Sequence, residues 1–161
     1  MRTLFRRLAL IAAFAPAAAL GATLFATPAE AAPVSEATLQ ADIVRLTNVQ
    51  RAAHGCGALK VDSRLITAAR GHSAYMAGTG AFSHTGRGGS NFVAREKAAG
   101  YAKPSAENIA WGYRSGKDVV SAWMKSPGHR ANILNCKSTT VGVGAVYSKG
   151  GAPYFTQDFG Y

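Results

Sequence analysis

Motifs that identify a hydrolase or a metal site by spacing alone are absent from this sequence of 161 residues. There is no G-x-S-x-G elbow for a nucleophilic serine, and no H-E-x-x-H or C-x-x-C spacing supports a metal site on its own. Ser83 adjoins His84, but neighbouring side chains on an extended segment point to opposite faces and are poorly placed to share a proton. A serine or cysteine protease is therefore not expected.

Acidic residues are also scarce, at 8 Asp and Glu against 18 Lys and Arg, for a net charge of +10. The basic residues are scattered, without the dense run or the interleaved aromatics of a nucleic-acid surface, so a nucleic-acid partner is not expected. The excess positive charge instead favours anionic surroundings, such as acidic polymers of a cell wall or a host.

The N-terminus has the features of a secretory signal peptide. Three arginines precede an apolar run over residues 8–25, and an A-x-A site ends at Ala31. We expect residues 1–31 to be removed and 32–161 to form a single secreted domain, a monomer without a membrane span; retention of the segment as an anchor is the alternative. Without residues 1–31 the chain carries 15 basic and 7 acidic residues, a net charge of +8.

Cys56 and Cys136 are the only two cysteines. An exported chain meets an oxidising environment in which thiols pair, so we predict one disulfide between them, with two buried free thiols as the alternative.

Apolar spacing and capping residues predict four helices before the C-terminal region. They begin near Ser35, after Asp62, at Asn91 and after Ser115, each of which is a good N-cap. His72 lies on the apolar stripe of the second helix, which favours a hydrogen-bonded core histidine over a ligand.

The strands are predicted from alternation. AENIAWGY forms one, and TTVGVGAVY and PYFTQDFGY form an antiparallel hairpin across the turn SKGGA. Gly142 and Gly144 leave one strand face bare for close approach by a helix or a ligand. Gln157 lies between two aromatic residues on its own strand face, so we expect it to be buried and to find polar partners. The result is an α+β fold with helices packed on a central antiparallel sheet.

The segment SPGHRANILNC contains a further helix start. Ser126 followed by Pro127 is typical of an N-cap with proline at the first helical position, which places His129 in the first turn. The helix dipole opposes a positive charge there and favours a neutral imidazole, the form that accepts a proton or binds a metal. A purely structural role for His129 is the alternative.

Four sequence motifs occur in the order typical of one family: FSHT, AENIAWG, AWMKSPGHRANILN, and VGVGAVY with YFTQDFG. Together they resemble the CAP superfamily of cysteine-rich secretory, antigen 5 and pathogenesis-related 1 proteins, in its compact bacterial form, from about Ser35 to Tyr161. The resemblance implies an α-β-α sandwich whose cleft holds two histidines and two acidic residues, a set that binds zinc or another divalent ion in some members.

Carried onto this chain, the resemblance makes His84, Glu107 and His129 the cleft residues, and Ser126 stands where many relatives have the second glutamate. We add Gln157 to the cleft because of its polar position. Two histidines and one carboxylate could hold Zn²⁺ with a water as fourth ligand, or could form a metal-free triad in which Glu107 holds a histidine. Glu96 lies on a different predicted element and is not substituted for the missing acid.

Two functions follow as hypotheses. The preferred one is a non-catalytic extracellular binding module that takes a glycan, a lipid or a divalent ion in the cleft formed by His84, Glu107 and His129. The alternative is an extracellular hydrolase, zinc-assisted or not, in which the same residues are catalytic.

Overall fold

The computed structural model describes residues 32–161, and the predicted signal peptide, residues 1–31, lies outside the described residues. The helices of this part are α1 (Glu36–Ala53), α2 (Ser63–Thr79), α3 (Phe92–Ala98), α4 (Gly116–Lys125) and α5 (Pro127–Ile133), with a 3-10 turn η1 at Arg87–Gly89. The strands are β1 (Lys60–Val61), β2 (Pro104–Trp111), β3 (Thr140–Tyr147) and β4 (Pro153–Gly160).

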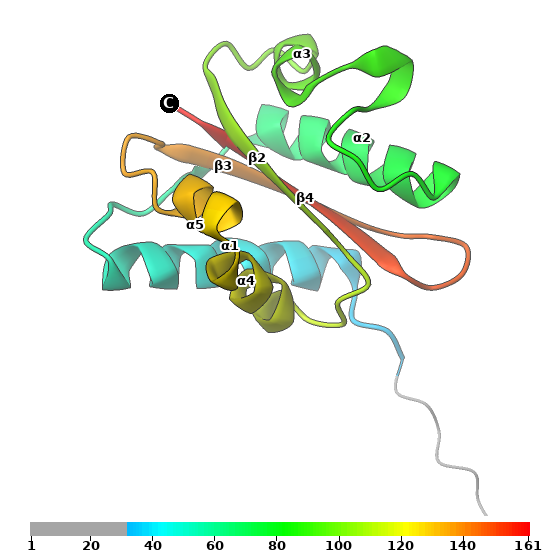
Figure 1. Ribbon diagram of the computed structural model, residues 1–161, viewed down its shortest axis with the longest axis horizontal. Coiled ribbons are helices and arrows are strands. Elements are labelled where there is room, and N and C mark those ends of the chain that lie inside the picture. The colour runs from blue at the N-terminus through cyan, green and yellow to red at the C-terminus, as the bar shows by residue number, and fades with distance from the viewer. Residues whose placement is uncertain (1–31) are drawn as a thin grey trace, which may run out of the picture. The chain divides into compact units, whose positions relative to one another are not determined.

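The elements form three layers, shown in Figure 1: α2 covers one face of the sheet, and α1, α4 and α5 lie on the other. The α-β-α sandwich predicted from the sequence is therefore confirmed. The sheet order is β1-β3-β4-β2, and β3 and β4 form the expected antiparallel hairpin with β2 antiparallel along β4. The sheet is mixed rather than purely antiparallel, because β1 pairs in parallel with β3. A strand of two residues is too short to show alternation in a sequence.

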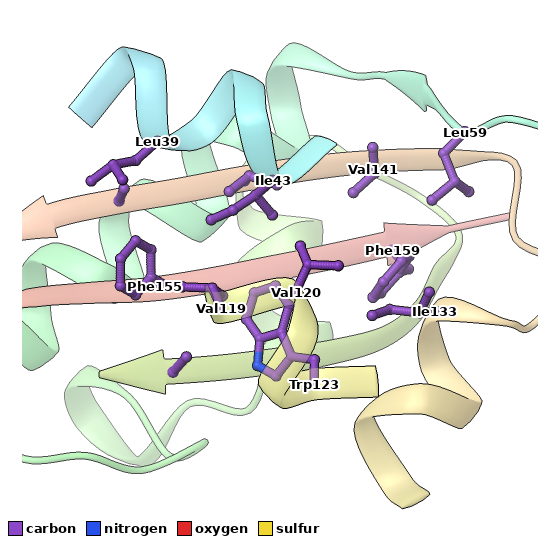
Figure 2. Packing of buried hydrophobic residues seen from close by; sticks show 13 residues of the cluster. Leu39, Ile43, Leu59, Val119, Val120, Trp123, Ile133, Val141, Phe155 and Phe159 are labelled. Carbon is purple, nitrogen blue, oxygen red and sulfur yellow. The ribbon is translucent and has the colours of Figure 1, made fainter. Parts of the chain in front are cut away.

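The larger core lies between the sheet and α1, α4 and α5 (Figure 2). Leu39 and Ile43 of α1 meet Phe155 and Phe159 of β4 there, all fully buried. Trp123 of α4 closes the same core and donates its indole N–H to the carbonyl of Ile109 in β2 at 3.0 Å. This bond attaches α4 to the strand that carries Glu107.

Gly142 and Gly144 of β3 bring the opposite face close to α2, as the sequence indicated. A Cβ atom at Gly142 would overlap the backbone at Leu65, and one at Gly144 would overlap the backbone at Ala69. The two glycines therefore serve a helix and not a ligand.

We predict that Gly144→Ala lowers the free energy of unfolding by about 1–3 kcal/mol, because the helix backbone cannot yield as a flexible side chain could. The matched control is Gly71→Ala within α2, where an added Cβ meets nothing within 4 Å. The control should raise stability by about 0.5–1 kcal/mol through helix propensity. Urea denaturation followed by circular dichroism measures both, and equal effects would contradict the packing argument.

A disulfide joins Cys56 to Cys136, as predicted, across a sequence separation of 80 residues. The same region is fixed by Arg51 of α1, which is fully buried. Its guanidinium donates to four backbone carbonyls, those of Gly57, Ile133, Asn135 and Ser138, at 2.8–2.9 Å. Arg51 and the disulfide thus hold the C-terminal end of α5, the helix of His129.

Among residues 32–161, no helix combines the length and the apolar character needed to cross a membrane.

Candidate functional site

Glu107 lies at the centre of the site, on β2, with its side chain only 1% exposed. His84 Nδ1–H donates to its Oε1 at 2.8 Å, and Arg95 Nη2–H donates to its Oε2 at 2.5 Å. Both carboxylate oxygens are therefore engaged, and the negative charge has a cationic partner within the fold. The hydrogen bond by which Glu107 holds a histidine, considered from the sequence, is thus present between Glu107 and His84.

Arg95, on α3, also fixes the loop that carries His84. Its Nη1 donates to the carbonyls of Ser90 at 2.8 Å and His84 at 3.1 Å. His72 of α2 contacts the same loop, since its Nε2–H donates to the carbonyl of Ser83 at 2.9 Å. His72 is 1% exposed, so its prediction as a core histidine is confirmed, and burial lowers its pKa. Arg95 was not predicted as a site residue, because no sequence motif links α3 to the strand that Arg95 contacts.

His129 projects from the first turn of α5 and is partly exposed. Its ring lies beside Trp123, with centroids 6.5 Å apart and planes inclined by 50°. Burial lowers the pKa of His129, and the charge of His84 lowers it further. Both effects favour the neutral imidazole, the form that the sequence predicted for His129, although burial is the first cause and the helix dipole was the cause expected from the sequence.

Ser126 stands at the junction of α4 and α5, where its position between the two helices was predicted correctly. The predicted side-chain cap is wrong: within the described residues, the Ser126 hydroxyl makes no capping hydrogen bond to α5. The backbone holds the junction instead, since Ser126 N–H donates to the Trp123 carbonyl at 3.1 Å. Ser126 also lines a groove that His129 shares.

Gln157 is fully buried and does not line that groove. Its Nε2 donates to Thr47 Oγ1 at 2.8 Å, and its Oε1 accepts from Asn108 Nδ2 at 3.1 Å. Asn108 also donates to the carbonyl of His129 at 3.3 Å and accepts from Asn132 at 2.9 Å. Gln157 therefore supports His129 from the core. The two asparagines were missed, although both lie in the motifs ENIA and HRANILN.

A groove of about 290 Å³ opens beside this network. His129 and Ser126 line it together with the aromatic side chains Phe82, Trp111, Tyr113 and Trp123. The structure thus places His84 and Glu107 in direct contact and His129 on the adjoining groove. The aromatic side of the groove was not predicted from the sequence.

Two further acids lie buried behind Glu107. Asp158 on β4 is its direct partner in the strand register, and Glu96 comes from α3; both are fully buried. Burial, and next the charge of Glu107, raise the pKa of Glu96 to about 8 and the pKa of Asp158 well above its usual range. Among the described residues, nothing donates a hydrogen bond to either carboxyl group.

The predicted metal set does not fit this geometry. In residues 32–161, no three His, Cys, Asp or Glu side chains lie close enough together to hold a metal ion. Glu107 has both oxygens bonded to Arg95 and His84, and His84 directs Nδ1 at the carboxylate. A cation would have to displace the Arg95 guanidinium to reach Glu107.

Fold and site together define a small α-β-α sandwich with a glutamate-held histidine, His84, and a groove lined by a second histidine, His129. The sequence profile of the cysteine-rich secretory protein (CAP) family matches residues 44–159. The chain belongs to this family, as the ordered motifs predicted.

Two curated relatives come from Bacillus subtilis strain 168. The uncharacterized protein YkwD is 38% identical over 129 residues, which are 80% of this chain and 49% of the relative. The uncharacterized membrane protein YlbC is 34% identical over 125 residues, which are 77% of this chain and 35% of the relative. The chain thus spans about half or less of the length of these relatives.

Solved structures share the fold. An extracellular protein containing a SCP domain from Bacillus anthracis matches with a TM-score of 0.71 and 30% identity over 81% of this chain and 45% of its own. An outer surface protein of Borrelia burgdorferi matches with a TM-score of 0.66 and 21% identity over 73% of this chain and 88% of its own.

Proposed function

We propose that this chain is an exported CAP-domain module that captures an extracellular ligand in the cleft of His84, Glu107 and His129 without turning it over. The observation that carries the proposal is the internal pairing of Glu107 with Arg95 and His84. A carboxylate with both oxygens occupied is a poor general base and a poor metal ligand, whereas a rigid, prepaired site loses little freedom when it binds a ligand.

Three features support export. Residues 1–31 have the basic start, the apolar run and the A-x-A site of a secretory signal. Residues 32–161 contain a disulfide, which persists in oxidising compartments. The Bacillus anthracis structure at 30% identity is described as an extracellular protein. We therefore infer that the domain acts outside the cytoplasm.

The test compares His129→Ala with the control His54→Ala, an exposed histidine at the end of α1. Four probes are presented to the purified protein: a neutral glycan (colloidal chitin), an acidic glycan (polygalacturonate), phosphatidylcholine vesicles and zinc chloride. We expect wild type and the control to bind at least one probe, and His129→Ala to bind it roughly tenfold more weakly. Binding is measured by sedimentation or calorimetry.

The same proteins are incubated with chromogenic ester, peptide and glycoside substrates to test the hydrolase alternative. Turnover that disappears in His129→Ala and persists in His54→Ala would replace the binding proposal with that alternative. Failure of wild type to bind all four probes, or equal binding by His129→Ala, would overturn the proposed cleft.

A further inference from the structure

Three large aromatic side chains lie exposed around the groove next to His129. Phe82 is 51% exposed, Trp111 53% and Tyr113 37%. They come from different segments: the loop after α2, the end of β2 and the turn that follows it. A monomer seldom leaves several aromatic rings uncovered around one depression unless something binds there.

The groove continues at Tyr113 and Ala122, which also line a second, shallow depression of about 570 Å³. This part is more polar than the groove beside His129, and its charged residues are Arg114, Lys125 and Asp118. Asp118 Oδ2 already accepts a hydrogen bond from the Ser115 hydroxyl at 2.6 Å. An extended ligand would therefore pass from an aromatic surface with a neutral histidine to a surface with two exposed basic side chains.

We propose that this continuous groove binds an acidic polysaccharide, with one sugar ring stacked on Trp111 and Tyr113 and a sugar carboxylate or phosphate at Arg114 and Lys125. Sugar rings present C–H groups that pack on aromatic faces, and their hydroxyls bond to groups such as His129 and Ser126. The proposal rests on the function proposed above and names the class of its ligand. The net charge of +8 over residues 32–161 favours an anionic chain.

A peptide is the competing macromolecule, and a lipid the competing small ligand. The groove is open along its length and carries charged side chains at one end, whereas an acyl chain is best covered by an enclosed apolar channel. A peptide would fill the aromatic part with one apolar side chain and would gain little from two basic residues beyond it. The acidic polysaccharide uses both parts, and the other two ligands serve as probes in the test.

Tryptophan fluorescence gives a direct measurement, because the chain has 2 tryptophans. Trp123 is 2% exposed and Trp111 is 53% exposed, so a ligand on the groove changes mainly the emission of Trp111. Polygalacturonate is titrated into the purified protein, and its fully methyl-esterified form, which keeps the sugar backbone and lacks the charge, is the matched control. We expect a saturable change with the acidic polymer and binding at least tenfold weaker with the ester.

Variants separate stacking from charge. Trp111→Ala should weaken sedimentation with polygalacturonate at least tenfold, while Tyr161→Ala, an exposed aromatic at the C-terminus, should not change it. The double variant Arg114→Gln and Lys125→Gln should reduce the preference for the acid over the ester, whereas Lys60→Gln on β1 should leave it unchanged. Retained melting temperatures show that the exposed positions alter binding and not folding.

Any of three contrary results would overturn the inference. Polygalacturonate bound equally by wild type and Trp111→Ala would show attraction by general charge only. Binding of phosphatidylcholine vesicles or of an apolar peptide through Trp111, without binding of the acidic glycan, would assign the groove to another ligand and leave the proposed function standing. If wild type binds none of these probes, the inference fails, and the proposed function fails with it only when colloidal chitin and zinc chloride are not bound either.

Discussion

Arg95→Met is expected to lower the free energy of unfolding by about 3–5 kcal/mol, the range for removing one partner of a buried ion pair. The side chains of Arg95 and Glu107 are 11% and 1% exposed, so solvent cannot replace the lost partner. Glu107 would then lie against Asp158 and Glu96 without its cation. The loop of His84 would also lose two hydrogen bonds from Arg95 to its backbone carbonyls.

The matched control is Arg45→Met, which removes a surface pair with Asp42 whose side chains are 62% and 42% exposed. Exposed pairs contribute at most about 1 kcal/mol, so the control should change little. Urea denaturation at neutral pH, followed by circular dichroism, measures both variants. A loss in Arg95→Met no larger than that in Arg45→Met would show that Arg95 does not hold the site together.

The local structure of this protein could be predicted from sequence because its signals are local. Four N-cap side chains accept a hydrogen bond from the first turn of the helix that follows, as their residue types predicted: Ser35, Asp62, Asn91 and Ser115. The hairpin of β3 and β4 follows from two alternating runs and a glycine-rich turn. Ser126 is the exception, since its backbone already completes the junction between two helices.

The environment of Glu107 could not be predicted in the same way. Arg95 and Glu96 belong to a seven-residue helix, and Asp158 reaches Glu107 only through the register of β4 on β2. Charged residues are usually exposed, so sequence reasoning places such acids on the surface. For Gln157 the burial was predicted, but its hydrogen-bond partners were not. Those partners, Thr47 and Asn108, depend on how α1 and β2 pack.

The pH dependence of stability should reveal the buried acid Glu96 of α3. Its pKa is raised from 4.5 to about 8 in the folded protein, chiefly by burial and then by Glu107. A raised pKa means that the folded state holds a proton that the unfolded state releases. The stabilisation is therefore complete below about pH 4.5 and is lost as the pH rises to about 8. Wild type should thus become less stable from pH 5 to pH 8.

Glu96→Gln keeps the shape of the side chain and removes the ionisation. We expect it to be more stable than wild type at pH 8 by roughly 3–5 kcal/mol and nearly equal at pH 4, since each unit of pKa shift corresponds to about 1.4 kcal/mol. Urea denaturation at several pH values measures the difference. Asp158 stays in both proteins and, with its own raised pKa, gives both a slope of the same sign, so the difference between them isolates Glu96.

Asp42→Asn is the control for this experiment, because Asp42 lies in a surface pair with its side chain 42% exposed. Its effect should stay below about 1 kcal/mol at every pH. A Glu96→Gln variant that is less stable than wild type at pH 8 would mean that the ionised carboxylate of Glu96 is bound by a cationic group, with Arg95 the nearest candidate. A Glu96→Gln variant that is more stable than wild type at pH 8 would instead show that Arg95 pairs with Glu107 and not with Glu96. The proposed binding cleft depends on this pairing.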